Sequence, residues 1–420
     1  MTRKGFTRKI NPLTLLTEEQ VEDLHRATLE VLRETGVRFE SEWALDFFAR
    51  HGCNVDRDAM RVRFPEALVE ECLRRAPGSF HVKAPKPEND LLLGGNTTYF
   101  THSSGMQIVD LDTFEPRVAT KQEYVDCVRV LDALDTVDLL GAYPYFGYQG
   151  VSPAMSIPEG VALKMKHSAK HQMEGCSNDN EIFTIQMAQA MGQEITVIVG
   201  SSPPLAWGND AVNGARRMVK AGFHLTTVDG CMPGGNAPVT IAGAVVVSNT
   251  AHLAMIVLAQ LLNPGHRISI GHFSMPMNMS TGSPAFGQMD SSISNVISNQ
   301  MWRHYRVLFS NGSPGYVSAR TMDFQAGCEK TAAGILAAVS GAHFILLHLG
   351  VFGEMTSHPV QAVLDDEVWM IGRFTEGEEV HEGTISNWWG KSSGAAVSGC
   401  TSPARCRRRT KVSPPNLGRR

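Results

Sequence analysis

The sequence lacks any uninterrupted run of about 18 apolar residues, the length that a helix needs to cross a bilayer. The longest apolar stretch covers residues 254–262, and Ser248, Asn249 and His252 lie just before it. The first ten residues are basic but lead to Asn11-Pro12 instead of an apolar signal-peptide core. These absences argue against secretion and membrane insertion, and they predict a cytoplasmic protein.

Metal-binding and nucleotide-binding motifs are also missing. The eight cysteines include no C-x-x-C pair, and no histidine pair has zincin spacing around a glutamate. His167 and His171 are four residues apart and would share a helix face if that segment is helical, but no third ligand is evident. No G-x-G-x-x-G follows a strand, and neither a Walker loop nor a G-x-S-x-G elbow occurs. We therefore expect reduced thiols and no bound metal.

The charges are unevenly distributed along the chain. The formal net charge is −4, but 8 of the 38 Lys and Arg residues and none of the 42 Asp and Glu residues lie from Gly383 onward. The acidic remainder argues against a nucleic-acid-binding surface. The basic end could bind nucleic acid, but a like-charge run is usually a solvated tail, and we predict an unstructured tail over residues 383–420.

Residues 1–80 have the pattern of a helical extension. Thr17 and Gln20 have the spacing of a capping box, apolar residues follow at helical intervals, and Gly36 fits the end of a helix. Pro65 is in the position of a first helical residue. We predict an N-terminal helical extension that is separate from the rest of the chain.

From residue 81 onward, short apolar stretches alternate with longer helical ones, which is typical of a parallel sheet covered by helices. The predicted strands cover residues 137–140, 195–199, 224–228, 267–270, 307–309 and 344–349. The predicted helices cover residues 121–134, 180–192, 210–221, 239–262, 288–303 and 325–339. This repetition predicts an α/β fold, a (β/α)8 TIM-type barrel over residues 81–382, rather than an open sheet.

In such a barrel the active site lies at the carboxyl ends of the strands. His348 interrupts an apolar strand near its end, with Phe352 and Glu354 just beyond it. A buried histidine is often only a satisfied core residue, and a pocket role is an equal alternative here. His102, in a strand-like run with Tyr99, is a second candidate for the pocket.

Two loops that follow predicted strands are further candidates. Residues 143–148 contain four aromatic side chains, Tyr145 and Phe146 among them, which could enclose a cation or serve as ordinary packing. Gly234 and Gly235, followed by Asn236, would allow a flat ligand to approach the backbone, or could form a tight turn before the next helix.

Several segments combine into a more specific pattern. They cover residues 234–243, 258–265, 282–284 and 323–330, and the last reads Asp-Phe-Gln-Ala-Gly-Cys-Glu-Lys. In this order and spacing they resemble the trimethylamine methyltransferase family of corrinoid-dependent methyltransferases, from about residue 15 to about residue 380. The family's fold is a β/α barrel with an N-terminal helical extension, in agreement with the pattern above.

The resemblance also implies a substrate class. The archaeal trimethylamine enzyme of this family carries pyrrolysine at a position that corresponds, counted without gaps, to Gly315 of this chain. This chain has no pyrrolysine, so it resembles the branch whose members demethylate quaternary amines such as glycine betaine, proline betaine or carnitine. Gly315 is expected to leave room for a corrin face or a bulky methyl donor.

The chemistry of a quaternary ammonium fits the missing pyrrolysine, because such a cation donates a methyl group without further activation. The site would then hold the cation with aromatic rings and exclude water. If the donor is a betaine, its carboxylate needs a partner, which His348, His102 or Arg320 could supply. We expect Gly315 and His348 to be catalytic, and Tyr99, His102, Tyr145, Phe146, Arg320 and Phe352 to bind the substrate.

The cofactor is expected on a second protein. The chain has no D-x-H-x-x-G cobalamin-binding motif, so the corrinoid would be carried by a partner protein and would approach Gly234, Gly235 and Asn236. The chain could also form a homo-oligomer. The resemblance ends after about Glu382, whereas relatives usually continue, and a frameshifted or truncated reading frame would explain this end.

Two other functions remain open at this point. A barrel lyase or hydrolase could use His348 with a carboxylate such as Glu354 or Asp229, and dependence on a metal with indifference to cobalamin would favour it. A non-catalytic betaine-binding protein is the second alternative, and tight binding of a donor without turnover would favour it.

Overall fold

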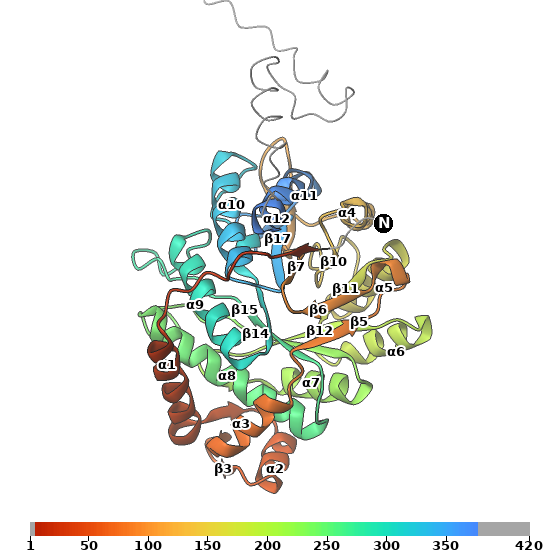
Figure 1. The fold of residues 1–420 in the computed structure, drawn as a ribbon. Helices are drawn as coiled ribbons and strands as arrows, with labels where there is room; N and C mark the ends of the chain where they lie inside the picture. Colours follow the sequence, from red (N-terminus) through yellow and green to blue (C-terminus); the bar gives the residue numbers. More distant parts are fainter. Residues whose placement is uncertain (1–4, 377–420) are drawn as a thin grey trace, which may run out of the picture. The chain divides into compact units, whose positions relative to one another are not determined.

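Eight mutually parallel strands lie at the centre of the fold (Figure 1). The computed structural model describes residues 5–376. The strands pair in the order β7–β17–β16–β15–β14–β12–β11–β10, and β1 pairs antiparallel with β7. Their bounds are β1 Phe6–Thr7, β7 Thr97–His102, β10 Leu139–Leu140, β11 His171–Gly175, β12 Ile195–Gly200, β14 His224–Asp229, β15 Ile268–His272, β16 Leu308–Asn311 and β17 Phe344–His348.

The first and last strands of this series adjoin each other. The backbone N–H of Asp138 donates to the carbonyl of Phe100 in β7 at 2.9 Å. The Asp138 carboxylate in turn accepts from the backbone N–H groups of Phe100 and Gly5, both at 2.9 Å. Because Asp138 directly precedes β10, the nine-stranded sheet curls until β10 lies beside β7.

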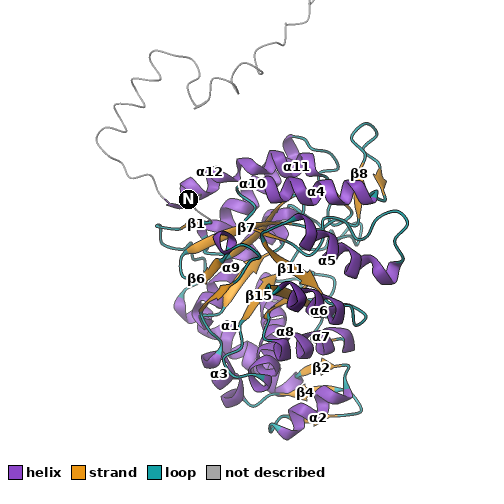
Figure 2. Cartoon of the chain, turned by 90° about the vertical axis from the view of Figure 1, so that its right-hand side faces the viewer, coloured by secondary structure: helices purple, strands orange, loops and turns teal. Residues whose placement is uncertain are grey.

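Helices surround the strands (Figure 2). They alternate with the parallel strands along the chain, which confirms the prediction of an α/β fold. Their bounds are α4 Lys121–Ala133, α5 Ser156–His167, α6 Glu181–Met191, α7 Asn209–Ala221, α8 Ile241–Leu262, α9 Met289–Tyr305, α10 Phe324–Val339, α11 Pro359–Asp365 and α12 Trp369–Glu376.

Helix α8 is more apolar than the absence of a long uninterrupted apolar run in the sequence indicates. Among the described residues it is the one helix whose length and composition would allow it to cross a membrane. However, 78% of its most apolar window is buried inside the fold, between the sheet and the N-terminal helices. Its hydropathy is therefore explained by burial in the core.

The six predicted strands correspond to β10, β12 and β14–β17, with ends that differ by one or two residues. Strand β11 and helix α5 are among the elements that the sequence pattern does not predict. Strand β11 reads His-Gln-Met-Glu-Gly, and its polar side chains hide its burial from the sequence pattern. Helix α5 precedes it and ends at His167, so His167 and His171 lie in different elements and share no helix face. The prediction that these two histidines could share a helix face is therefore wrong.

Residues 1–80 are not wholly helical, which corrects the prediction for this segment. The capping box of Thr17 and Gln20 is confirmed at the start of α1, and α1 and α3 pack on α8. Strands β2–β4 form a small sheet that β13, from the middle of the chain, extends. The bounds are α1 Glu18–Glu30, β2 Val37–Phe39, α2 Glu42–Arg50, β3 Asn54–Asp56, β4 Arg61–Arg63, α3 Glu66–Arg75 and β13 Ala206–Trp207.

Two further sheets close the ends of the strand series. The hairpin of β5 (Ser79–Val82) and β6 (Leu91–Gly94) packs on inward side chains near the amino ends of the strands. At the other end, β8 (Gln107–Val109), β9 (Pro116–Arg117), β18 (Gly350–Val351) and β19 (Thr356–Ser357) form a four-stranded sheet. The predicted tail at 383–420 lies outside the described residues.

Candidate active site

A cavity of about 160 Å³ lies at the carboxyl ends of the parallel strands. Each of the eight strands, or the residue directly after it, contributes to the wall. In strand order along the chain these residues include His102, Gly141, Met173, Ile198, Thr226, Gly271, Ser310 and Leu346. Active sites of barrels and open α/β sheets lie at this end of the strands, so the cavity is the candidate active site.

A larger hollow of about 360 Å³ lies elsewhere, between α10 and the helices α11 and α12. The charged groups in it are already paired, since Lys330 Nζ lies 2.8 Å from Asp365 Oδ2 and donates to the Leu347 carbonyl at 2.7 Å. This hollow is on the outer side of the strands, and Leu347 of β17 is the one residue of the described parallel strands that lines it. We therefore assign the chemistry to the cavity inside the sheet.

Strand alternation determines which side chains face the cavity. Residues two apart on a strand point the same way, so His224, Thr226 and Val228 of β14 share the inner face. Thr226 and Val228 line the cavity, whereas His224 lies deeper, with its ring centroid 4.8 Å from that of Phe80. Ser310 of β16 likewise lines the cavity.

A chain of hydrogen bonds starts at the floor of the cavity. Thr226 Oγ1 lies 2.8 Å from Ser269 Oγ, and Ser269 Oγ lies 2.9 Å from His224 Nε2. On the other side of the ring, His224 Nδ1 lies 2.9 Å from Thr196 Oγ1. All four residues are buried, so the chain is shielded from solvent.

The chain continues to the amino end of the strands. Thr196 Oγ1 lies 2.8 Å from His171 Nε2, and His171 Nδ1 lies 2.9 Å from the Lys83 carbonyl oxygen. Burial lowers the pKa of His171 to about 4 and lowers the pKa of His224 well below its usual value. Both rings are therefore neutral at pH 7.

Aromatic rings and one carboxylate lie along the cavity wall. The rings of Phe273 and Tyr316 meet edge to face, with centroids 5.1 Å apart, and both line the cavity. Glu354 lines it too, and partial desolvation raises the pKa of its carboxyl group. Burial, and then the charge of Glu354, raises the pKa of Tyr316 and Tyr143. No Lys or Arg is among the described residues that line the cavity.

The loop that carries Glu354 is tied to the β8–β9 hairpin. The backbone N–H of Met106 donates to the Glu354 carbonyl at 3.0 Å, and that of Gln107 donates to the Met355 carbonyl at 3.0 Å. Strand β19 pairs with β8 directly after this contact. The position of Glu354 at the cavity therefore depends on the position of the hairpin.

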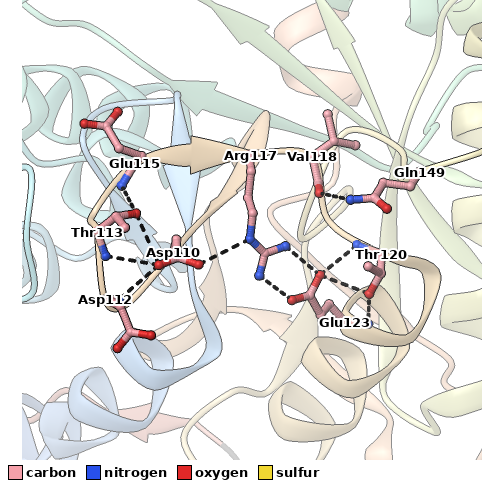
Figure 3. Close-up of polar contacts among 9 residues, drawn as sticks. All are labelled: Asp110, Asp112, Thr113, Glu115, Arg117, Val118, Thr120, Glu123 and Gln149. Carbon is pink, nitrogen blue, oxygen red and sulfur yellow. Dashed lines mark hydrogen bonds and ion pairs between the residues drawn. The ribbon is translucent and has the colours of Figure 1, made fainter.

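Arg117 anchors the hairpin to α4 (Figure 3). Its guanidinium donates to both carboxylate oxygens of Glu123, at 3.0 and 2.6 Å, and lies 3.6 Å from Asp110 Oδ2 on the hairpin turn. Glu123 also accepts from the backbone N–H of Thr120 at 2.7 Å in the capping box of α4. The hydrogen bonds from Arg117 lower the pKa of Glu123 to about 2, so both side chains are ionised at pH 7.

The predicted site residues all lie in the described part of the chain. Of these residues, His102 alone lines the cavity. Its Nδ1 lies 2.7 Å from the Ser103 carbonyl, so Nδ1 carries the proton and Nε2 is an acceptor. Nε2 is buried and has no hydrogen-bond partner. Burial lowers the pKa of His102 to about 3. The neutral ring therefore presents no proton to a substrate carboxylate.

Gly315 lies in a tightly packed turn beside the cavity. A Cβ atom there would lie 2.8 Å from Ser103 Cβ and 2.9 Å from the Leu346 carbonyl oxygen. The expectation that Gly315 leaves room for a large ligand is therefore wrong. Gly312, three residues earlier, lines the cavity directly at the end of β16. A catalytic role of Gly315 remains a prediction.

His348 does not line the cavity, contrary to expectation. A register shift between Leu346 and His348 in β17 accompanies the change of face, and Leu346 lines the cavity instead. His348 Nε2 lies 2.9 Å from Thr136 Oγ1, which donates to Asp366 Oδ1 at 2.6 Å. Burial lowers the pKa of His348 to about 3. The geometry gives this side chain a packing role, and its catalytic role is untested.

The predicted aromatic residues also lie off the cavity. Tyr99 packs in the interior near the β5–β6 hairpin, and its hydroxyl donates to the Leu92 carbonyl at 3.0 Å. Tyr145 is buried, with its ring centroid 6.3 Å from that of Tyr124. Phe146 is partly exposed. The structure does not bring these three rings together as a cage.

Arg320 and Phe352 contact each other instead of lining the cavity. The guanidinium carbon of Arg320 lies 4.9 Å from the centre of the Phe352 ring. Gly234, Gly235 and Asn236 form a tight turn after β14, and their approach to a flat ligand remains a prediction. The side chain of Asn236 accepts from the backbone N–H of Met232 at 2.6 Å.

Sequence reasoning missed most of the cavity wall. Thr226, Gly271, Gly312, Phe273 and Tyr316 belong to no recognisable motif, and only strand alternation identifies Thr226. The sequence pattern suggests Glu354 only as a partner for His348 in a lyase or hydrolase. No group of three or more His, Cys, Asp or Glu residues suited to a metal ion occurs in the region from residue 5 to residue 376.

Comparison with known proteins connects this cavity to a chemistry. The family model of trimethylamine methyltransferase (MTTB) matches residues 1–387. The chain is 28% identical over 393 residues to trimethylamine methyltransferase MttB of Desulfitobacterium hafniense, covering 88% of this chain and 76% of the relative. It is 27% identical over 372 residues to glycine betaine methyltransferase of another strain of that species, covering 84% and 75%.

A third relative belongs to the same group of methyltransferases, and two solved structures share the fold. Proline betaine:corrinoid methyltransferase of Eubacterium limosum is 25% identical over 375 residues, covering 84% of this chain and 76% of the relative. The monomethylamine methyltransferase MtmB of Methanosarcina barkeri superposes with a TM-score of 0.60 at 14% identity, covering 91% of this chain and 81% of the other. A hydroxylamine complex of MtmB gives a TM-score of 0.62 at 13% identity, covering 91% and 80%. This chain belongs to the trimethylamine methyltransferase (MTTB) family.

Proposed function

We propose that this enzyme moves a methyl group from a quaternary ammonium donor to the cob(I)alamin of a separate corrinoid protein. The observation that carries the proposal is the cavity wall, which combines the rings of Phe273 and Tyr316 with the carboxylate of Glu354 and has no Lys or Arg among its described residues. Ring faces and a carboxylate attract an ammonium ion whose charge lies on its methyl groups.

The names of two relatives support this donor class. Glycine betaine methyltransferase and proline betaine:corrinoid methyltransferase both act on quaternary amines, as their names state. A quaternary nitrogen leaves as a neutral tertiary amine when its methyl group is taken, so no proton has to be supplied. The residues of the cavity then have to bind the cation, orient one methyl group and exclude water.

The parallel strands support a closed barrel. We infer that β7 and β10 complete an eight-stranded (β/α)8 barrel, because the backbone of Asp138 bonds to Phe100 across the junction of these strands. The residues before β7 would then form an extension on the outside of the barrel. Closure would make the cavity accessible from the carboxyl ends of the strands alone, since the β5–β6 hairpin packs at the other end.

The corrinoid would remain outside the cavity, whose volume of about 160 Å³ is too small for a corrin ring. When bound, the reduced cobalt supplies the nucleophile that accepts the methyl group. The segments after six of the parallel strands each expose an apolar side chain that a partner could cover, five of them in loops and Phe324 at the start of α10. These residues are Met106, Phe146, Val239, Met279, Phe324 and Met355.

Spectroscopy tests the proposed function directly. Purified protein is mixed with reduced cob(I)alamin and, in turn, with glycine betaine, carnitine, proline betaine, choline, tetramethylammonium and trimethylamine. The proposal predicts conversion of the cob(I)alamin absorbance to that of methylcobalamin with at least one quaternary donor. Absence of conversion with every donor, both with free cobalamin and with a corrinoid protein, would contradict it.

A further inference from the structure

The hydrogen-bond chain below the cavity has a fixed direction. A carbonyl oxygen only accepts hydrogen bonds, so His171 Nδ1 must carry the proton that meets the Lys83 carbonyl. The neutral ring of His171 then has an acceptor at Nε2, which the hydroxyl of Thr196 must donate to. Thr196 Oγ1 is consequently free to accept the proton of His224 Nδ1.

The same logic fixes the other half of the chain. With its proton on Nδ1, neutral His224 accepts at Nε2, and the hydroxyl of Ser269 donates to it. Ser269 Oγ therefore accepts from the hydroxyl of Thr226. The hydroxyl proton of Thr226 is donated to Ser269. The hydroxyl oxygen of Thr226 can therefore present only lone pairs to the cavity that this residue lines.

Two other polar groups in the wall are restricted in the same way. The hydroxyl of Ser310 donates to the Ile270 carbonyl at 3.3 Å, which leaves its oxygen as an acceptor. His102 carries its proton on Nδ1, where the Ser103 carbonyl accepts it, and its Nε2 has a free lone pair. Two groups from β14 and β16 thus offer acceptors and no donor, whereas His102 Nε2 is buried within the wall.

The direction of methyl transfer determines which part of the donor meets this floor. The acceptor reaches the cavity from the mouth, so the methyl group that is transferred must face the mouth. The acceptor attacks the methyl carbon on the side opposite the leaving nitrogen: the C–N bond breaks, its electron pair stays on nitrogen, and the acceptor supplies the pair for the new bond to carbon. The three other arms of the nitrogen must then point toward Thr226 and Ser310.

We propose that the methyl donor is a quaternary ammonium ion whose non-transferred arms carry no anionic group, with N-methyl or N-methylene hydrogens in contact with the oxygens of Thr226 and Ser310. This inference rests on the proposed function and narrows its substrate class. Carbon-bound hydrogens beside a positive nitrogen are weak donors and suit oxygen lone pairs. Tetramethylammonium and choline have such arms.

A betaine fits this floor poorly. Its carboxymethyl arm would bring a carboxylate against acceptor lone pairs, and it would gain no ion pair, because no Lys or Arg is among the described lining residues. Glu354 adds a like charge at the wall. Like charges placed together in a binding site oppose binding.

Binding to the full chain without corrinoid tests the inference. Isothermal titration would compare tetramethylammonium and choline with glycine betaine and with 3,3-dimethylbutan-1-ol, the neutral carbon analogue of choline. We expect the two cations to bind about tenfold tighter or more than either of the other ligands. Glycine betaine binding as tightly as choline, or more tightly, overturns the inference.

Two variants test the role of the hydrogen-bond chain below the cavity. Thr226→Val removes the oxygen and keeps the shape, so it should weaken choline binding by about three- to tenfold and leave the neutral analogue unchanged. Ser269→Ala removes the acceptor for the Thr226 proton, which could then turn into the cavity and reduce the preference for choline over glycine betaine. Unchanged choline affinity in Thr226→Val, or an unchanged preference in Ser269→Ala, contradicts this role.

Thr250→Val is the matched control. Thr250 is also a buried threonine, and its hydroxyl donates to the Val246 carbonyl at 2.7 Å within α8. Its replacement should leave both affinities unchanged. The two proposals fail in different ways: methyl transfer from glycine betaine with tighter betaine binding overturns only the inference, whereas no binding and no methyl transfer from any quaternary donor overturns the proposed function as well.

Discussion

The ammonium group of Lys164 lies 3.0 Å from Glu174 Oε1, and neither side chain is exposed to solvent. Lys164 Nζ also donates to the carbonyls of Gly141, Ala142 and Met173, at 2.5, 2.8 and 2.9 Å. These three residues line the cavity from β10 and β11. Burial lowers the pKa of Lys164 and raises that of Glu174 to about 7. The pair therefore holds one side of the cavity wall in place.

Removing only the Lys164 ammonium should lower the free energy of unfolding more than removing both Lys164 and Glu174. Lys164→Met leaves Glu174 buried without a partner, and we expect it to lower the free energy of unfolding by about 3–5 kcal/mol. Lys164→Met combined with Glu174→Leu should lose less, because no charge remains buried. Denaturant unfolding measures both. Arg129→Ala, which breaks an exposed pair with Asp126, is the control and should change stability by less than about 1 kcal/mol. A double variant less stable than Lys164→Met would contradict the argument.

Glu354 should determine the affinity for the cation. Glu354→Gln keeps the shape of the side chain and removes its charge, so we expect the dissociation constant for a quaternary donor to rise about three- to thirtyfold. KM should increase more than kcat falls, because the attraction exists before the reaction begins. Titration calorimetry and steady-state rates measure the two effects. Equal affinity in Glu354→Gln and the wild type would exclude Glu354 from the binding site.

Arg117 should affect the cavity from a distance. Arg117→Ala frees the β8–β9 hairpin from α4 (Figure 3). The hairpin is hydrogen-bonded to the loop with Glu354. We expect donor affinity to fall about two- to tenfold, while stability changes by about 1 kcal/mol or less because the pair is partly exposed. Arg129→Ala in α4 is again the control for affinity. A loss of affinity in Arg129→Ala as large as in Arg117→Ala would remove the specific role of the hairpin.

Much of the framework of strands and helices is predictable because apolar strands alternate with amphipathic helices. Strands β12 and β17 are apolar enough to be recognised from the sequence alone. Strand β11 is not, because His171 and Glu174 are polar yet buried, and their partners Thr196 and Lys164 are visible only in three dimensions. Pattern recognition fails where hydrogen bonds, rather than apolar contacts, stabilise burial.

The site was harder to predict than the fold. His348 and Tyr99 have the residue types expected of a pocket, but a register shift in β17 and the depth of Tyr99 place them elsewhere. Gly312 and Tyr316 lie in the expected segment, yet only the structure distinguishes them from Gly315. A resemblance between sequences identifies the family and the end of the strands, whereas the lining side chains follow from strand register.

Stability should fall as the solution becomes acidic. Burial holds the pKa of His171 and His272 at about 4 and that of His252 at about 3, against 6.5 for an exposed histidine. Between pH 6.5 and 4 the unfolded chain therefore binds protons that the fold does not, and each such histidine costs about 1.4 kcal/mol per pH unit. Glu174, with its pKa raised to about 7, acts in the opposite sense. Denaturant unfolding at pH 7, 6 and 5 should show a steep decrease, and constant stability over this range would contradict it.

The central claim is that a methyl group leaves a quaternary ammonium ion and reaches cobalt without a proton from the residues of the cavity. The most direct measurement incubates the protein with reduced cob(I)alamin and tetramethylammonium carrying labelled methyl groups. Mass spectrometry then quantifies labelled methylcobalamin and trimethylamine. The account predicts equal amounts of the two products. Trimethylamine without methylcobalamin would indicate a lyase or hydrolase, and no product from this or any other quaternary donor would contradict the account.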